Sequence, residues 1–212
     1  MHTLTKPTLR FAMALAALAG CVDAIAFMQL GGYFISFMSG NSTRLAVGIQ
    51  HGDWQVASTL ASIIASFVAG AALGARVKRR APRYSKTTNV LIVVSLLLLI
   101  AALCNSTGST WIAMLLIAVA MGAENSALQS NGDNVVGVTY MTGTLVKMGQ
   151  RIDDAFNGGG ALSWLPYLLL WLGLIAGGIT GAILFSHYAF NALWFAAGWA
   201  VLLTLIQSRK KY

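Results

Sequence analysis

Four ionisable residues lie within or beside apolar stretches, where an unpaired charge is costly. Asp23 and Glu124 lie in long apolar runs, whereas Arg44 and Lys147 lie in shorter, more polar stretches. A charged side chain at the bilayer centre costs about 2.5–3.5 kcal/mol on insertion scales, so such residues mark ion pairs, proton relays or substrate pathways. We expect Asp23 to face Arg44 and Glu124 to face Lys147, and Asp23, Glu124 and Asn125 to serve gating or coupling. A purely structural role for these pairs is an equal alternative.

Small polar residues precede each of the two cations. The first cluster contains Ser39, Gly40, Asn41 and Thr43 before Arg44, and the second contains Thr142, Gly143 and Thr144 before Lys147. Ser, Thr and Asn are favoured helix caps, and a helix N-terminus offers unpaired N–H groups to an anion. We therefore predict that these residues bind a substrate, with a carboxylate or other small anion as the preferred class. Ordinary capping of two short helices is the alternative interpretation.

Other kinds of site lack their characteristic spacing. The sequence contains no zinc-type H-E-x-x-H helix, no nucleophile with a nearby base and no pair of carboxylates in register. Its three histidines have no ligand spacing, and Cys21 and Cys104 fit neither a metal site nor a paired thiol. We expect no catalytic residues, no metal and no cofactor.

The composition is that of a protein that faces lipid. The 212 residues are 57% hydrophobic and only 9% charged, and the mean hydropathy is +0.71. A soluble domain carries roughly 25% charged residues, so too few charges remain to cover a water-facing surface. The net charge of +8 would suggest nucleic acid as a partner in a soluble protein. Here the cations lie in linkers between apolar runs, which excludes that interpretation.

Six stretches are long and apolar enough to cross a bilayer, a distance that takes about 20 helical residues. They cover approximately residues 9–30, 55–76, 87–105, 110–131, 164–185 and 189–207. Leu18–Cys21 resembles a lipoprotein cleavage box, but the apolar run continues to Leu30, which favours a retained first span. Two less apolar stretches, 33–50 and 135–152, are predicted not to cross.

The placement of cations supports six crossings with both chain ends inside. Of the 14 Lys and Arg residues, six lie between Arg76 and Lys86 and three near the C-terminus. Six crossings put every cation except Arg44 on the inner side, whereas eight would place the Arg76–Lys86 linker outside, against the positive-inside rule.

The sequence also indicates an internal duplication within a single membrane domain, residues 1–212. Gly20–Ala24 aligns with Gly122–Ser126, Ser36–Gly40 with Thr139–Gly143, and the G-x-x-x-G pair Gly70/Gly74 with Gly177/Gly181. Repeat one covers about 9–105 and repeat two about 110–207. Three crossings per repeat invert the second copy, which predicts an all-α integral membrane protein with a 3+3 inverted-topology repeat and two short re-entrant or broken helical segments.

At these residues the chain resembles the YoaK family, uncharacterised bacterial membrane proteins proposed to be small-molecule transporters. The resemblance rests on Phe37–Arg44 in the first half, on Thr139–Leu145 in the second half, and on Asp23-Ala24. It covers essentially the whole chain. At the position before Asn125 the family pattern implies an uncharged amide side chain, whereas this chain has Glu124. The resemblance implies a membrane protein and suggests transport, but it implies no substrate.

Taken together, the sequence predicts a secondary transporter of a small, anionic molecule that works by alternating access in the bacterial cytoplasmic membrane. Its partners would be the bilayer and a small-molecule substrate, and the sequence leaves open whether it forms a homo-oligomer. A channel-like pore and a membrane scaffold or assembly protein are the alternatives. The glycine pairs predict close helix packing, either within the chain or between subunits.

Overall fold

The computed structural model describes residues 6–82, 86–128 and 140–209 of the chain, and within them every regular element is a helix. The first half contains α1 (Lys6–Gln29), α2 (Met38–Gln50), α3 (Trp54–Arg80) and α4 (Lys86–Ser106). The second half contains α5 (Thr110–Glu124), α6 (Met141–Phe156), α7 (Leu165–Tyr188), the 3-10 turn η2 (Ala189–Ala192) and α8 (Leu193–Ser208). Thr139 and the start of the predicted stretch 135–152 lie outside the described residues.

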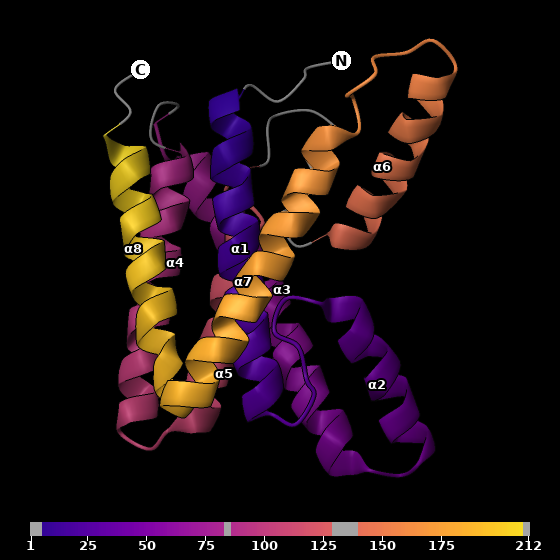
Figure 1. Cartoon of the computed structure of the whole chain (residues 1–212). Helices are drawn as coiled ribbons and strands as arrows, with labels where there is room; N and C mark the ends of the chain where they lie inside the picture. Colours follow the sequence, from indigo (N-terminus) through magenta and orange to yellow (C-terminus); the bar gives the residue numbers. More distant parts are fainter. Residues whose placement is uncertain (1–5, 83–85, 129–139, 210–212) are drawn as a thin grey trace.

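The long helices form one bundle and the two short helices lie at opposite ends of it (Figure 1). The start of α1, the end of α3 and the end of α8 lie at the same end, drawn uppermost, and the α4–α5 turn lies at the other. Helix α6 lies at the upper end beside α7, whereas α2 lies at the lower end beside α3. The helices therefore follow the predicted order, with the two polar segments approaching from opposite ends.

All of the bundle helices are apolar, and most of them have the length needed to cross a bilayer. Four candidate spans meet this standard in the described ranges: Pro7–Gln29, Trp54–Arg80, Lys86–Ser106 and Leu165–Ser208, the last of which contains both α7 and α8. Helix α5 is apolar but has only 15 residues, about 22 Å at 1.5 Å per residue. Large hydrophobic side chains such as Val68, Leu96 and Ile179 are exposed on the bundle. The chain is thus a helical membrane protein.

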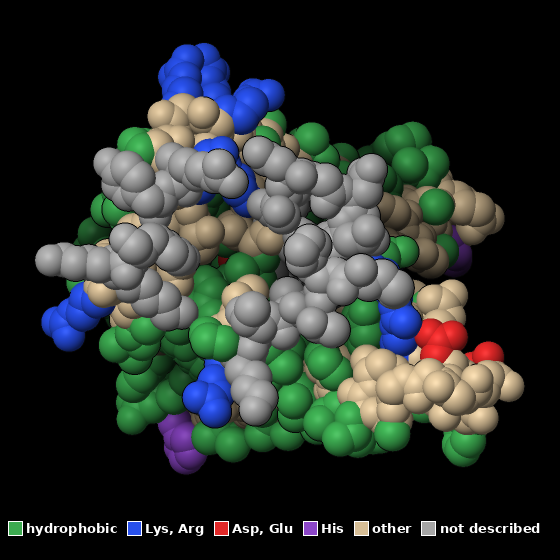
Figure 2. Space-filling view, turned by 90° about the horizontal axis from the view of Figure 1, so that it is seen from above, with side chains coloured by type: hydrophobic (Ala, Val, Ile, Leu, Met, Phe, Trp, Pro, Cys, Tyr) green, Lys and Arg blue, Asp and Glu red, His purple; other side chains and the backbone are tan. Residues whose placement is uncertain are grey.

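Figure 2 views the end of the bundle at which the chain termini lie. Lys and Arg side chains project around the rim of this end, and hydrophobic side chains cover the flanks. The last turn of α3 alone supplies Lys78, Arg79 and Arg80. Cations thus concentrate at one end of the bundle, as the distribution along the sequence predicted.

Backbone contact at glycines joins α1 to α7. A Cβ atom added to Gly177 would fall 1.9 Å from the carbonyl oxygen of Ala17, and one added to Gly181 would fall 2.3 Å from that of Cys21. A Cβ at Gly20 would likewise meet the carbonyl oxygen of Leu174 at 2.1 Å. Small residues let helix backbones approach closely in membranes, where dispersion contacts replace the hydrophobic effect as the driving force.

The same arrangement joins α3 to α5. Added Cβ atoms at Gly70 and Gly74 would lie 2.0 Å and 2.7 Å from the carbonyl oxygens of Val119 and Ala123, and one at Gly122 would lie 2.1 Å from that of Phe67. Each residue here is the counterpart, in the predicted duplication, of a residue in the α1–α7 contact. The glycine pairs therefore pack within the chain, and they pair a helix of one half with a helix of the other.

Candidate functional site

Asp23 holds the broken segment between α1 and α2. After α1 the backbone turns at Gly31 and Gly32, whose φ angles of 64° and 109° favour glycine. The N–H groups of Ile35 and Ser36 both donate to Asp23 Oδ1, at 2.8 Å and 2.7 Å. The Ser36 hydroxyl donates to Asp23 Oδ2 at 2.5 Å. Asp23 thus satisfies backbone groups that a broken helix leaves without partners.

Asn41 fixes the same segment from the other side. Its side-chain oxygen accepts a hydrogen bond from the Phe34 N–H at 3.1 Å, and its side-chain nitrogen donates to the Phe34 carbonyl at 2.6 Å. The Asn41 side chain is fully buried. It therefore completes the backbone hydrogen bonds of Phe34 much as a neighbouring strand would.

Arg44 contacts this segment too, but not Asp23. Its Nη1 atom donates to the Gly32 carbonyl, and its guanidinium carbon lies 4.8 Å from the centroid of the Tyr33 ring, within cation–π range. The predicted Asp23–Arg44 ion pair is wrong. The Asp23 carboxylate is bonded to Ile35 and Ser36, whereas the Arg44 guanidinium is bonded to the Gly32 carbonyl and lies over the Tyr33 ring.

The glycines of the two polar motifs lie beneath aromatic rings. A Cβ atom at Gly40 would lie 2.6 Å from the Phe37 ring, and one at Gly143 would lie 2.1 Å from the Tyr140 ring. Both glycines sit in the first turn of a short helix, α2 or α6, as predicted. The aromatic residues occupy the N-cap positions, and neither cap has a side-chain hydrogen bond.

Hydroxyl groups near these helix starts bond within their own helix. Thr43 donates to the Ser39 carbonyl at 3.1 Å, and the fully buried Thr144 donates to the Tyr140 carbonyl at 3.2 Å. Thr142 is exposed. The predicted capping by these side chains is therefore wrong, because an aromatic residue, not Ser, Thr or Asn, precedes each helix.

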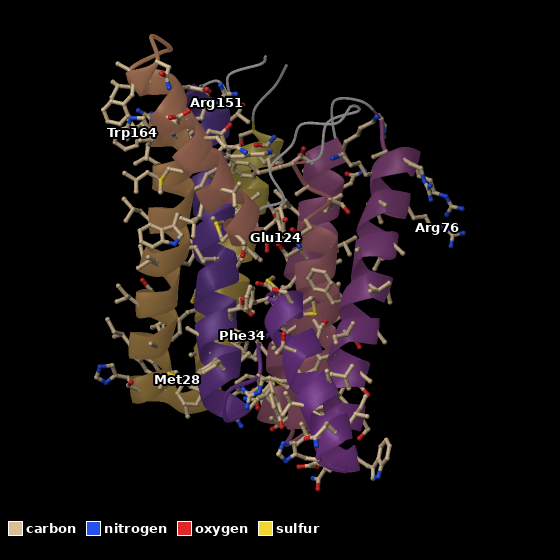
Figure 3. All side chains as sticks on the ribbon, turned by 90° about the vertical axis from the view of Figure 1, so that its right-hand side faces the viewer. Met28, Phe34, Arg76, Glu124, Arg151 and Trp164 are labelled. Carbon is tan, nitrogen blue, oxygen red and sulfur yellow. The ribbon has the colours of Figure 1, made fainter. Side chains whose placement is uncertain are left out.

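Glu124 is fully buried, and neither of its carboxyl oxygens has a hydrogen-bond partner among the residues that the structure describes. Its helix, α5, contacts α1, which carries Asp23. In Figure 3 Glu124 lies near the level of Arg76 and above Phe34. The predicted Glu124–Lys147 ion pair is not formed, and the half-buried Lys147 has no described side-chain partner. Asn125 donates to the Met121 carbonyl at 3.0 Å.

Polar contacts from α3 and α4 hold the chain just after Glu124. Lys78 Nζ donates to the Ser126 carbonyl at 2.6 Å, and the Thr87 hydroxyl donates to the Ala127 carbonyl at 3.0 Å. The end of α5, which carries Glu124, is therefore fixed to the end of the bundle that holds the cations.

A cavity of about 500 Å³ lies beside Asp23, between α1, α7 and the start of α6. Helix α1 contributes Asp23 and Phe27, the broken segment contributes Phe34 and Ser36, and α6 contributes Met141. Residues that adjoin both polar motifs thus meet at one cavity. Of the described residues that line it, only Asp23 is ionisable. Arg44 and Lys147 do not line it, and neither do Gly40 or Gly143.

Three phenylalanines that sequence reasoning did not assign to the site form one wall of this cavity. The Phe27 and Phe34 ring centroids lie 5.0 Å apart, and those of Phe34 and Phe37 lie 5.2 Å apart in an edge-to-face arrangement. Met28 and Phe34 are labelled near each other in Figure 3, toward the end of the bundle opposite Arg76. The sequence feature that could have indicated this wall is the concentration of aromatic residues around the glycines of this segment.

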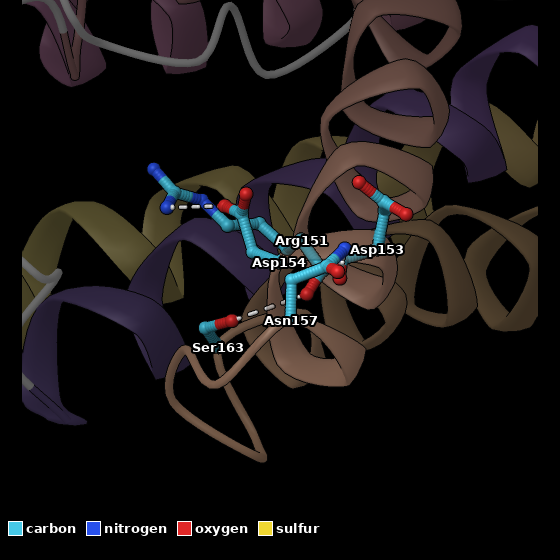
Figure 4. A network of polar contacts seen from close by, with 5 residues as sticks. All are labelled: Arg151, Asp153, Asp154, Asn157 and Ser163. Carbon is cyan, nitrogen blue, oxygen red and sulfur yellow. Dashed lines mark hydrogen bonds and ion pairs between the residues drawn. The ribbon is translucent and has the colours of Figure 1, made fainter.

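A separate polar network closes the connection between α6 and α7 (Figure 4). Arg151 forms an ion pair with Asp154 at 3.0 Å, the Ser163 hydroxyl donates to the Arg151 carbonyl, and Asn157 donates to the Asp153 carbonyl. Asp153 and Asp154 are exposed and lie in the last turn of α6, next to this connection. The network stabilises a turn and lies apart from the residues that line the cavity.

Comparison with known proteins places the chain in a family. A family model described as a protein of unknown function, DUF1275, matches residues 11–206. A UPF0700 transmembrane protein of Rhizobium meliloti (strain 1021) is 37% identical over 191 residues, which cover 90% of this chain and 82% of that protein. No solved structure matches. Kinship with an uncharacterised family of membrane proteins is thus confirmed, and the chain belongs to the DUF1275 family.

Proposed function

We propose that the protein is a secondary transporter that moves a small molecule across the bacterial cytoplasmic membrane by alternating access. The observation that carries this proposal is the close packing of helices at glycines across the two halves of the chain. Helix α1 packs on α7 at Gly177 and Gly181, and α3 packs on α5 at Gly70 and Gly74. The two contacts are equivalent to each other, and each joins the first helix of one half to the third helix of the other half. Secondary transporters are commonly built from such inverted repeats, with the substrate site at the repeat interface.

The proposed topology has six crossings, with both chain ends and the Arg76–Lys86 linker cytoplasmic. Helices α2 and α6 would then enter from the outer and the cytoplasmic face, which agrees with their positions at opposite ends of the bundle. The resemblance of the Phe37–Arg44 and Thr139–Leu145 motifs to the YoaK family suggests transport but does not bear on the number of crossings.

The proposed substrate site is the cavity beside Asp23. It adjoins α1 and α7, which belong to different halves of the chain, and the segments before both polar motifs. Broken backbone at membrane depth is tolerated where it lines a cavity, and Asp23 and Asn41 stabilise such a break here. Because a carboxyl group is the ionisable group of its lining, the cavity does not support the anionic substrate expected from the sequence.

Glu124 is the proposed coupling residue. A buried carboxylate without a partner is costly, so this group favours a state in which it holds a proton or meets a cation. Helix α5, which carries Glu124, packs against α1, which carries Asp23 at the cavity. Occupation of the cavity would act on Glu124 through this contact, and in this way substrate movement would be coupled to proton movement.

Reconstituted protein tests the proposal. Proteoliposomes that contain the pH indicator pyranine would be exposed to a panel of anionic, neutral and cationic metabolites and amines. We expect a subset of these compounds to drive a saturable pH change that is absent from empty liposomes and from proteoliposomes that carry Glu124→Gln. Unsaturable flux would indicate a channel, and the absence of both proton flux and solute exchange across the whole panel would contradict transport.

A further inference from the structure

The cavity combines an acidic group with an apolar wall. Asp23 is surrounded there by Phe27, Phe34, Met141 and small residues of α1 and α7. No Lys or Arg is among the described lining residues, so the nearby cations of the chain do not neutralise this group from within the cavity. A ligand that enters meets a negative site in apolar surroundings.

Asp23 keeps capacity for a ligand. An ionised carboxylate offers about four acceptor positions, and three are used by Ile35 and Ser36. Its side chain is partly accessible, whereas its neighbour Val22 is fully buried. The existing hydrogen bonds fix the orientation of the carboxylate, so a cation would find it preorganised.

The phenylalanine wall adds a second feature that favours a cation. Aromatic faces attract ammonium groups within about 6 Å, by about 0.5 to 2 kcal/mol depending on desolvation. Along one side of the cavity the Phe34 ring contacts the rings of both Phe27 and Phe37. An apolar body would pack on these rings and on Met28, while its charged end would lie near Asp23. A lipid acyl chain would fill the apolar part but would leave the carboxylate uncompensated.

We propose that this cavity binds a monovalent organic cation, namely an amine with an aromatic or aliphatic body. The volume of about 500 Å³ lies within the range of small-molecule sites. This inference names the substrate class of the proposed transporter and rests on that function for its biological meaning.

The proposed preference for a cation can be tested by measuring how three ligands of similar shape bind to the purified full-length protein. The probes are 4-phenylbutylammonium, the neutral 4-phenylbutan-1-ol and the anionic 4-phenylbutyrate, measured by titration calorimetry in a non-ionic detergent. We expect the amine to bind about tenfold more tightly than the alcohol, and the acid more weakly still. In Asp23→Asn the amine should lose this advantage, while alcohol binding should stay within about twofold.

A second variant keeps the test decisive if Asp23→Asn fails to fold. Phe27→Leu removes one ring and no described hydrogen bond, and it should weaken amine binding several-fold more than alcohol binding. Phe156→Leu, an exposed position on α6 outside the cavity lining, is the matched control and should change neither. Equal affinity for amine and alcohol in the unaltered protein, or a preference that survives both cavity variants, would overturn the proposal. Binding of the amine without transport would contradict the proposed function alone.

Discussion

Asp23 on α1 accepts two hydrogen bonds from Ser36, one from its backbone N–H at 2.7 Å and one from its hydroxyl at 2.5 Å. This contact joins the end of a long apolar helix to the broken segment that precedes α2. It places a carboxyl group at the cavity and fixes the chain that carries Phe34 and Phe37. The structural role of Asp23 and its proposed role in binding therefore depend on the same hydrogen bonds. Variants that remove the charge but keep a hydrogen-bond acceptor are needed to distinguish the two roles.

Asp23→Ala should destabilise the protein by about 2–3 kcal/mol, because it leaves the N–H groups of Ile35 and Ser36 without acceptors. Asp23→Asn should cost less, since an amide oxygen still accepts a hydrogen bond and Asn125 is an amide at the equivalent position of the second half. Thermal unfolding in detergent measures both. A similar loss in both variants would mean that the charge, rather than the acceptor, holds the segment.

Gly177→Ala should be strongly destabilising, by about 1–3 kcal/mol or more, because its Cβ would overlap the Ala17 carbonyl oxygen on α1. Gly70→Ala should behave alike, since its Cβ would meet the Val119 carbonyl oxygen on α5. Gly198→Ala on α8 is the control: nothing lies within 4 Å of its Cβ, so the variant should be neutral or stabilising by up to about 1 kcal/mol. Unfolding temperatures of the three variants give the comparison, and tolerance of Gly177→Ala would contradict the close helix contact.

Glu124→Leu should leave stability unchanged or raise it by about 1–3 kcal/mol, because it removes a buried carboxyl group without a described hydrogen-bond partner. The same variant should abolish proton-coupled flux in proteoliposomes. The exposed Asp154→Asn is the matched control and should preserve flux. A Glu124→Leu protein that unfolds at markedly lower temperature would instead indicate that Glu124 has a stabilising partner.

Cysteines placed at the two ends of the bundle test the topology. In a background without Cys21 and Cys104, Arg79→Cys and Gly159→Cys should react with a membrane-impermeant maleimide only after the cells are opened. His51→Cys and Thr107→Cys should react in intact cells. Reaction of Gly159→Cys from outside would refute the inverted arrangement of the two halves.

The overall helical fold was predictable because apolar runs and basic linkers determine where a chain crosses a bilayer. The close packing at Gly74 and Gly181 was also predictable, since small residues one turn apart permit such contact. The partners of Asp23 and Arg44 were not. They include the N–H groups of Ile35 and Ser36 and the Gly32 carbonyl. Such backbone groups become available only where the helix breaks, which side-chain patterns do not reveal.

The cavity could not be predicted from the sequence either. Cations near the helix starts suggested an anion site, but Arg44 binds the Gly32 carbonyl and Tyr33 outside the cavity. The lining comes from four segments that are distant in sequence, including Phe34 and Met141. Spacing along the chain does not show which of these segments meet.

Phe37 and Tyr140 occupy equivalent positions at the starts of α2 and α6, and they offer the most direct measurement of alternating access. Phe37→Cys and Tyr140→Cys, each alone in a background without other cysteines, would be labelled from the outer and the cytoplasmic side, with and without 4-phenylbutylammonium and a pH gradient. Alternating access predicts that any condition that raises one labelling rate lowers the other. Two rates that rise together, or that respond to neither condition, would contradict it.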